Sequence, residues 1–258
     1  MQARVVDNAV SEVRSLVSQE EWATRVDLAA CYRLIAHHGW DDLIFTHVSA
    51  RVPGSHDFLI NPYGLMFEEV TASSLVRVDL HGTKTLHSSY SINPAGYIIH
   101  SAIHEAREDA GCVLHVHTME GVAVSCQKAG ILPISQQASI VSHSLAYHDY
   151  EGIALNPAEK QRLQQNLGRA HYLMLRNHGL LTVGRSVADA FMSMFTFQRT
   201  CEIQVKAQAG GAELLPVAAE VMATVPGYLR GVTRGEGSAL AWPALLRKMD
   251  RVDASFRN

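Results

Sequence analysis

The sequence predicts an α/β protein with three α/β/α layers around a central mixed, largely antiparallel sheet. Helix-like and strand-like segments are intermixed along the chain, and several strands lie close enough in sequence to form hairpins. No internal repeat, low-complexity tract or interdomain linker is visible, so residues 1–258 are expected to form a single domain. Its core should cover about residues 20–210, followed by a less regular C-terminal segment, 211–258.

The first half of the chain is expected to form one helix and then short strands. Residues 20–38 have the apolar stripe of an amphipathic helix, and Gly39 is a natural stop. Residues 43–52 and 58–60 are strand-like on either side of a Pro-Gly turn. Residues 76–80 alternate between apolar and polar side chains, which indicates a further strand.

The second half alternates helices with buried strands. Asn93 and Pro94 have the order of an N-cap followed by the first helical residue, and they predict a helix through residue 106. Ser186 opens the longest helix, in a capping-box pattern with aspartate in the third place. That helix is predicted to extend to residue 208. The other predicted elements are strands at 112–117, 172–175 and 180–183 and helices at 119–129 and 158–167, the latter with Asn156 as its cap.

Composition and charge limit the classes of partner. Hydrophobic residues make up 47% of the chain and charged residues 18%, as in ordinary globular proteins, and the net charge is −3. This charge gives no general attraction for nucleic acid or an anionic membrane. The charged N-terminus has no long apolar region, and no apolar stretch can span a bilayer. The four cysteines lack C-x-x-C spacing, so we expect free buried thiols in a cytoplasmic protein.

The most informative motif is His115-Val116-His117, which closes an apolar strand. Residues i and i+2 of a strand point to the same face, so both imidazoles can approach one cation. His178 follows a second apolar strand and precedes a glycine in a similar corner. Three protein ligands with an open coordination position are typical of a catalytic metal site. The sequence therefore favours an enzyme whose metal ligands are His115, His117 and His178.

Other histidines give weaker signals among the 14 in the chain. His100 and His104 have the i, i+4 spacing of one helix face, but no glutamate follows His100 as it would in a zinc protease helix. We assign this pair packing or surface roles. An acid or base is also needed, and Glu68 and Glu69 are the local candidates. The residues alone favour a solvated acidic pair before a turn.

Three ordered segments resemble the class II aldolase/adducin family: residues 58–71, 115–118 and 175–180. The resemblance extends over about residues 20–210 and is strongest toward the adducin head domain and its bacterial relatives. It implies the α/β/α fold and a homotetramer with fourfold symmetry, whose active sites lie at subunit interfaces near segment 211–258. In the family's sugar-phosphate aldolases, histidines matching His115, His117 and His178 hold Zn²⁺. A glutamate matching Glu68 fills the vacant ligand position or acts as the acid/base.

The resemblance fails where sugar-phosphate members bind phosphate. His47 replaces an asparagine, and the helix start at Asn93 lacks the family's serines and glutamate. A non-phosphorylated small molecule is therefore expected as the substrate. His47 and Asn93 are candidate substrate-binding residues, and His47 would either meet a carboxylate or have a structural role. The family's catalytic tyrosine cannot be assigned to either Tyr147 or Tyr150.

Two functions remain open. The first is a metal-dependent lyase that performs aldol cleavage or decarboxylation on a small hydroxy-carbonyl or hydroxy-carboxylate compound. It would use Zn²⁺, or Mn²⁺, with Glu68 or, alternatively, Glu69 as the acid/base. The second is a non-catalytic, adducin-like binding or oligomerisation module of the cytoskeletal type. The intact histidine set and the lack of a long basic tail after Asn258 favour the lyase.

Overall fold

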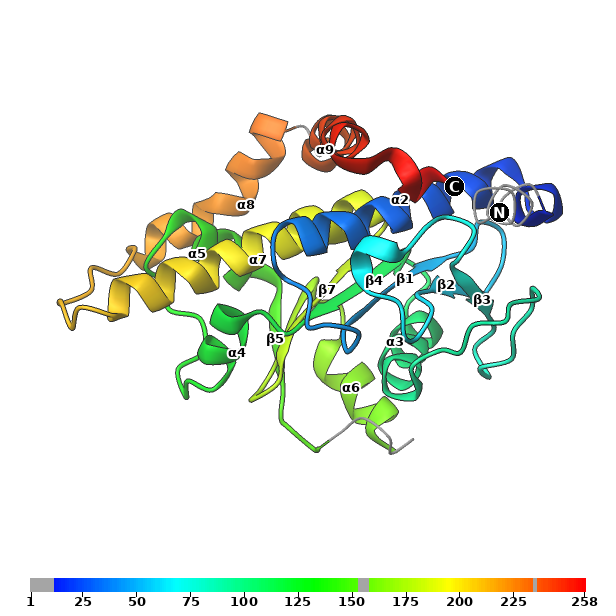
Figure 1. The fold of residues 1–258 in the computed structure, drawn as a ribbon. Helices are drawn as coiled ribbons and strands as arrows, with labels where there is room; N and C mark the ends of the chain where they lie inside the picture. The colour runs from blue at the N-terminus through cyan, green and yellow to red at the C-terminus, as the bar shows by residue number, and fades with distance from the viewer. Residues whose placement is uncertain (1–11, 153–157, 234–235) are drawn as a thin grey trace.

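The computed structural model describes residues 12–152, 158–233 and 236–258. A seven-stranded sheet in the order β3-β2-β1-β4-β7-β6-β5 runs through the centre (Figure 1). Neighbouring strands are antiparallel except β5 and β6, so the predicted mixed, mostly antiparallel α/β fold is confirmed. The strands are β1 (His47–Arg51), β2 (Phe58–Ile60), β3 (Val76–Val78), β4 (Cys112–Val116), β5 (Leu145–His148), β6 (Tyr172–Leu175) and β7 (Gly179–Gly184).

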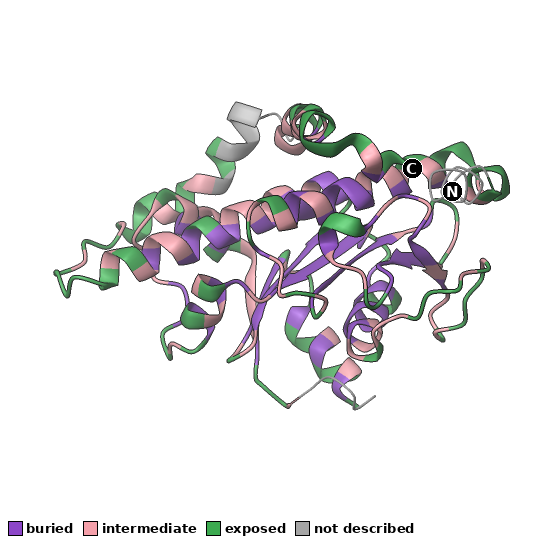
Figure 2. Cartoon of the chain, viewed as in Figure 1, coloured by how far each residue is buried: buried purple, intermediate pink, exposed green. Residues whose placement is uncertain are grey.

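The larger helical layer packs on one face of the sheet. Its long helices α2 and α7 are most buried along the sides that face the strands (Figure 2). The helices of this layer are α2 (Gln19–His37), α4 (Met119–Ser125), α5 (Gln136–Val141), α7 (Val187–Gln208) and α9 (Gly237–Asp253), and α8 (Ala219–Thr233) contacts α5. Ser18 and Ser186 cap α2 and α7 through their side-chain oxygens, as expected for residues before an apolar-periodic run.

The opposite face carries α3 (Pro94–Ala106) and α6 (Glu159–Leu167), which lie on the other side of the strands in Figure 1. Asn93 caps α3 and Pro94 is its first residue, as predicted. The predicted cap of α6, Asn156, lies outside the described residues. Strand β4 serves both layers, because Leu114 faces the larger layer while Val113 joins the α3–α6 core. By this alternation, His115 points toward the α3 side.

Several local predictions were wrong, and one of these is the helix expected at 119–129, which ends at Ser125. The strand expected at 43–52 begins only at His47, because Leu43 has φ +52 and residues 40–46 form a loop. Segment 211–258 is mostly helical, and Trp242 and Met249 of α9 pack into the core on α2 and α7. Cys126 is exposed, while the other three cysteines are free and buried as expected. Among the described residues, no helix combines the length and apolar character needed to cross a bilayer.

Candidate metal centre

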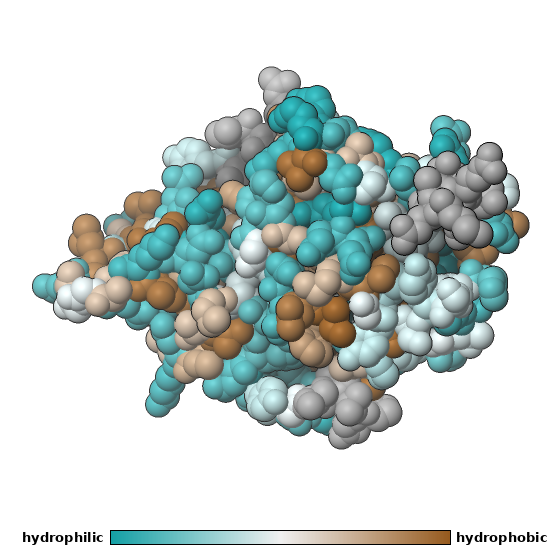
Figure 3. Space-filling view, in the orientation of Figure 1, coloured by the Kyte–Doolittle hydropathy of each residue, from teal (hydrophilic) through white to brown (hydrophobic). Residues whose placement is uncertain are grey.

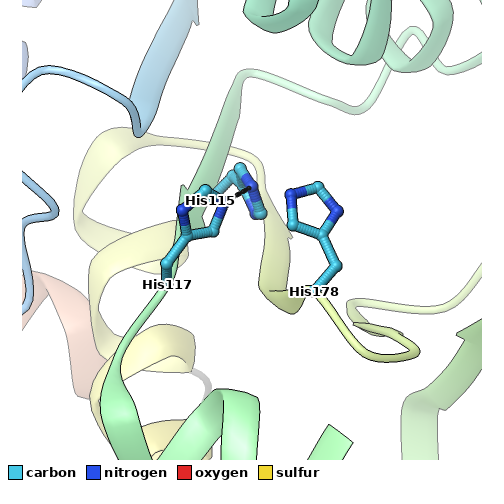
Figure 4. A group of neighbouring side chains, drawn as sticks. All are labelled: His115, His117 and His178. Carbon is cyan, nitrogen blue, oxygen red and sulfur yellow. Dashed lines mark hydrogen bonds between the residues drawn. The ribbon is translucent and has the colours of Figure 1, made fainter. Parts of the chain in front are cut away.

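The histidines predicted as metal ligands lie together. Each offers one ring nitrogen, and these nitrogens are within 4.8 Å of one another. His115 comes from β4, His117 follows the end of that strand, and His178 lies in the turn between β6 and β7 (Figure 4). Figure 4 shows the ring of His178 facing the other two across the gap between these elements.

The Asn177-His178-Gly179 turn explains how the third histidine reaches the pair. Asn177 has φ +57, a left-handed conformation that asparagine tolerates better than most residues. A Cβ atom on Gly179 would lie 2.5 Å from the Val116 carbonyl oxygen and 3.1 Å from the His117 ring. Glycine therefore allows β7 to approach the end of β4 closely enough for the three rings to meet.

Hydrogen bonds fix which nitrogens of the first two rings face the centre. Nδ1 of His115 lies 3.0 Å from the Leu180 carbonyl oxygen, and Nδ1 of His117 lies 3.0 Å from a carboxylate oxygen of Asp42. Both partners can only accept, so each Nδ1 carries a proton and Nε2 is the nitrogen of each ring that faces the centre. The two Nε2 atoms are 2.9 Å apart. A metal ion bound between the two nitrogens would account for this close approach.

The residues therefore fit a divalent metal ion. In a tetrahedral site with Zn–N distances of about 2.0–2.1 Å, neighbouring nitrogens are about 3.3–3.4 Å apart, which small ring rotations would produce here. Burial, with the neighbouring His117 and His148, lowers the pKa of His178 to about 4. Burial likewise places the pKa of His115 well below its ordinary value. Both rings are thus neutral, as metal ligands must be.

Glu68 lies on the 3-10 turn η1 (Phe67–Glu69), away from the close group of three nitrogens. Its side chain is exposed and lines a surface cavity of about 490 Å³ together with Arg33, His37 and Asp41. Glu69 caps this turn, because its carboxylate accepts the Met66 backbone N–H at 2.8 Å. Of the two carboxylates, Glu68 is therefore the one without a capping role.

His47 and Asn93 lie on the α3 side of the sheet. His47 pairs directly with His115 across β1 and β4, and the two ring centroids are 5.1 Å apart. Asn93 uses its side-chain oxygen to cap α3, accepting the Ala95 N–H at 3.1 Å. His47 thus adjoins the metal centre, whereas the amide oxygen of Asn93 already serves the helix.

The two tyrosines left open by the sequence have different surroundings. The Tyr147 hydroxyl accepts the Ile131 N–H at 3.1 Å, and its ring is covered by the Arg176 guanidinium. Tyr150 is 54% exposed, and its ring centroid lies 6.3 Å from that of His178. Tyr147 is therefore a packing residue, and of the two tyrosines Tyr150 is the one near the histidines.

Several residues around the centre were missed or misassigned from the sequence. Asp42 orients His117 from a loop 75 residues earlier, and no local spacing could reveal this. His100 and His104 are fully or almost fully buried and take part in hydrogen bonds with His47 and Ser49. The assignment to packing or surface roles is therefore too simple. The sequence did contain a signal for this network. His100 and His104 are four residues apart on one helix face, and His47 and Ser49 are two residues apart on one strand face.

Comparisons with known proteins identify the family of this domain. The model of the family described as Class II Aldolase and Adducin N-terminal domain matches residues 26–205. A Pseudomonas aeruginosa protein named for aldolase class 2 is 60% identical over 255 residues, covering 98% of both chains. The crystal structure of an aldolase II superfamily protein from Pseudomonas syringae superposes with a TM-score of 0.90 at 49% identity. It covers 95% of this chain and 99% of that one.

Adducins are also similar. Alpha-adducin of Rattus norvegicus is 43% identical over 245 residues, which are 88% of this chain but 33% of the adducin. The chain therefore matches about a third of that longer protein, and the likeness concerns the shared domain.

Proposed function

Because this chain belongs to the class II aldolase and adducin N-terminal domain family, we propose that it is a metal-dependent carbon–carbon lyase. The observation that carries the proposal is the close approach of Nε2 of His115 to Nε2 of His117, 2.9 Å apart, with a ring nitrogen of His178 beside them. A divalent ion bound there would serve as a Lewis acid and electron sink for aldol cleavage or decarboxylation. Three nitrogens suit Zn²⁺, with Mn²⁺ as the alternative.

Glu68 is the proposed acid/base. It is exposed and free of the capping bond that holds Glu69, so it can reorient toward a substrate. It lies beside Asp41, whose pKa is raised mainly by burial and also by Glu68 and Asp42. Asp42, next in the chain, orients His117, so loop 40–46 connects the proposed base with the proposed ligands.

The proposed substrate is a small, non-phosphorylated hydroxy-carbonyl or hydroxy-carboxylate compound. Phosphate commonly binds at a helix N-terminus, but at the start of α3 Pro94 has no N–H and Asn93 accepts the N–H groups of Ala95 and Tyr97. In this chain the ring of His47 lies against Gly96 in the first turn of α3, where a Cβ atom would be 2.5 Å from the ring. The imidazole thus packs against a helix start that has few free donors, and this supports a substrate without a phosphate.

We also propose a homotetramer whose active sites lie at subunit interfaces. Large hydrophobic side chains are exposed on segments that adjoin the centre: Leu43, Phe45, Met119 and Tyr150. Leu43 and Phe45 follow Asp42 in the sequence, Met119 follows His117, and the Tyr150 ring lies 6.3 Å from that of His178. Exposed apolar groups of this kind favour association with another surface. The face in Figure 3 likewise exposes hydrophobic side chains at several separate places. Light scattering of the purified protein would give the mass of the assembly, and a monomer would contradict this part of the proposal.

The metal assignment is tested by measuring the metal content of purified variants. We expect about one ion per chain in the wild type, loss of the ion in His115→Ala, and full content in His143→Ala, which removes an exposed histidine elsewhere. Glu68→Gln should keep the ion and lose carbon–carbon cleavage in a screen of hydroxy-carboxylates and hydroxy-aldehydes. Undiminished metal in His115→Ala would overturn the ligand assignment.

The second candidate is a non-catalytic binding or oligomerisation module, which the 43% identity to alpha-adducin favours. Such a module would have the same fold and would not need a bound metal ion. The same screen separates the two candidates. Cleavage that depends on the metal and on Glu68 supports the lyase. An assembled protein that binds no metal and cleaves none of these compounds supports the module.

A further inference from the structure

A chain of hydrogen bonds runs through the interior from the metal centre along α3. Nδ1 of His47 lies 2.7 Å from Nε2 of His100, and Nδ1 of His100 lies 2.5 Å from Oγ of Ser49. The same hydroxyl lies 2.7 Å from Nε2 of His104, whose Nδ1 is 3.1 Å from the Ala110 carbonyl oxygen. The chain thus joins three imidazoles and one hydroxyl in series and ends on a backbone acceptor.

The three imidazoles of this chain are neutral. His47, His100 and His104 are each at most 3% exposed, and none faces a carboxylate along the chain. Burial lowers the pKa of His104 to about 3 and places that of His100 well below its ordinary value. Arg51, beside His104, further disfavours a positive charge on that ring. Each ring therefore carries one N–H donor and one lone pair.

Donor counting then fixes every proton in the chain. A carbonyl oxygen only accepts, so Nδ1 of His104 carries the proton and its Nε2 is an acceptor. The single Ser49 proton must go to that Nε2, so Ser49 accepts from Nδ1–H of His100. Nε2 of His100 is then an acceptor, and it receives Nδ1–H of His47. Because the single proton of His47 is on Nδ1, its Nε2 carries a lone pair.

That nitrogen lies beside the metal centre. His47 is opposite His115 in the β1–β4 register, so their side chains share one face of the sheet. Nε2 forms no hydrogen bond with the described residues, and His47 keeps 3% of its surface exposed. The ring also lies against Gly96 in the first turn of α3, where the helix dipole disfavours an imidazolium.

We infer that Ser49, His100 and His104 are positioning residues that hold Nε2 of His47 as an obligate hydrogen-bond acceptor, which binds a hydroxyl group of the substrate. A lone pair attracts an O–H and repels a carboxylate. His47 should therefore contact a hydroxyl group of the substrate and not its carboxylate. The inference about the hydroxyl rests on the proposed function, whereas the proton positions do not.

Neutron diffraction from crystals of the metal-free protein tests the proton positions. We expect deuterium on Nδ1 of His47, His100 and His104, and none on their Nε2 atoms. In Ser49→Ala, we expect the rings of His47 and His100 to lose their fixed tautomer. Ser101→Ala removes a buried hydroxyl on α3 that is not part of this chain of hydrogen bonds, and it should leave both rings unchanged. Deuterium on Nε2 of His47 in the wild type would overturn the inference, even if the Ser49 variant does not fold.

A pair of small ligands tests the hydroxyl contact in the cobalt-loaded protein, through its visible spectrum. Glycolate carries a hydroxyl and oxalate has a carboxylate in its place. In His47→Phe we expect glycolate to bind about tenfold more weakly, the effect of one hydrogen bond, and oxalate to bind no more weakly than before. A larger loss for oxalate would show that His47 binds a carboxylate. Failure of cobalt to bind at all would count against the proposed function and leave the neutron result standing.

Discussion

Asp42 has the clearest role of any residue outside the histidine triad. Its carboxylate accepts the Nδ1 proton of His117 and leaves Nε2 as the donor for a metal. Carboxylates in this position fix the tautomer and ring orientation of a ligand, and their loss commonly weakens metal binding 10- to 100-fold. The adjacent Asp41 instead lines the cavity beside Glu68.

Asp42→Asn should therefore weaken zinc binding by about one to two orders of magnitude. The asparagine either presents its NH₂ group to Nδ1, which favours the wrong tautomer, or accepts more weakly through its amide oxygen. Competition with a chromophoric chelator measures the affinity, and Asp41→Asn is the matched control. Equal affinity in the two variants would show that Asp42 does not orient a ligand.

Helix α2 is held to the sheet by buried charges as well as by apolar packing. Arg25, fully buried, donates to Glu21 at 2.9 Å and to the Ala72 and Leu75 carbonyl oxygens. Glu21 also binds Arg77 of β3 at 2.7 Å. The network attaches α2 to the edge strand and to the turn before it.

Glu21→Ala should lower the free energy of unfolding by about 3–5 kcal/mol, because it leaves the buried Arg25 without its counter-charge. Asp250→Ala removes an ion pair with Arg257 at the surface, and it should cost less than about 1 kcal/mol. Urea denaturation measures both. A cost for Glu21→Ala no larger than that of the surface variant would mean that Arg25 is neutralised in another way.

The elements differ in how far the sequence reveals them. Helix α3 was predicted almost to the residue, because Asn93 and Pro94 mark its start by local chemistry. The start of β1 was misplaced, because the apolar residues Leu43 and Phe45 belong to an exposed loop and only tertiary contacts show this. The triad was found because strand parity and a corner glycine are local signals. Asp42 was not found, because its role depends on a contact across 75 residues.

At the scale of the whole molecule, the buried histidines make stability depend on pH. The pKa of an unfolded histidine is about 6.5, whereas His47 and His104 have pKa values of about 3 in the fold. Between these values the unfolded chain binds more protons, so the stability is fully present above about pH 6.5 and is lost as the pH falls toward 3. Each buried histidine contributes up to about 1.4 kcal/mol per pH unit in this window.

His104→Gln removes one of these groups, so the difference in unfolding free energy between wild type and variant should shrink as the pH falls from 7 to 5. Urea denaturation in the presence of a chelator measures this without contributions from a bound metal. His143→Gln, which replaces an exposed histidine, is the matched control for the loss of one histidine. A His104→Gln variant with the same slope as the wild type would mean that His104 is protonated in the folded protein.

The central claim is that His115, His117 and His178 hold one divalent metal ion. Anomalous diffraction at the zinc edge, from crystals equilibrated with Zn²⁺, tests it most directly. We predict a single strong peak per chain, about 2.0–2.1 Å from one ring nitrogen of each of the three histidines. A fully soaked crystal with no peak between these rings, or with its zinc only at other histidines, would contradict the account.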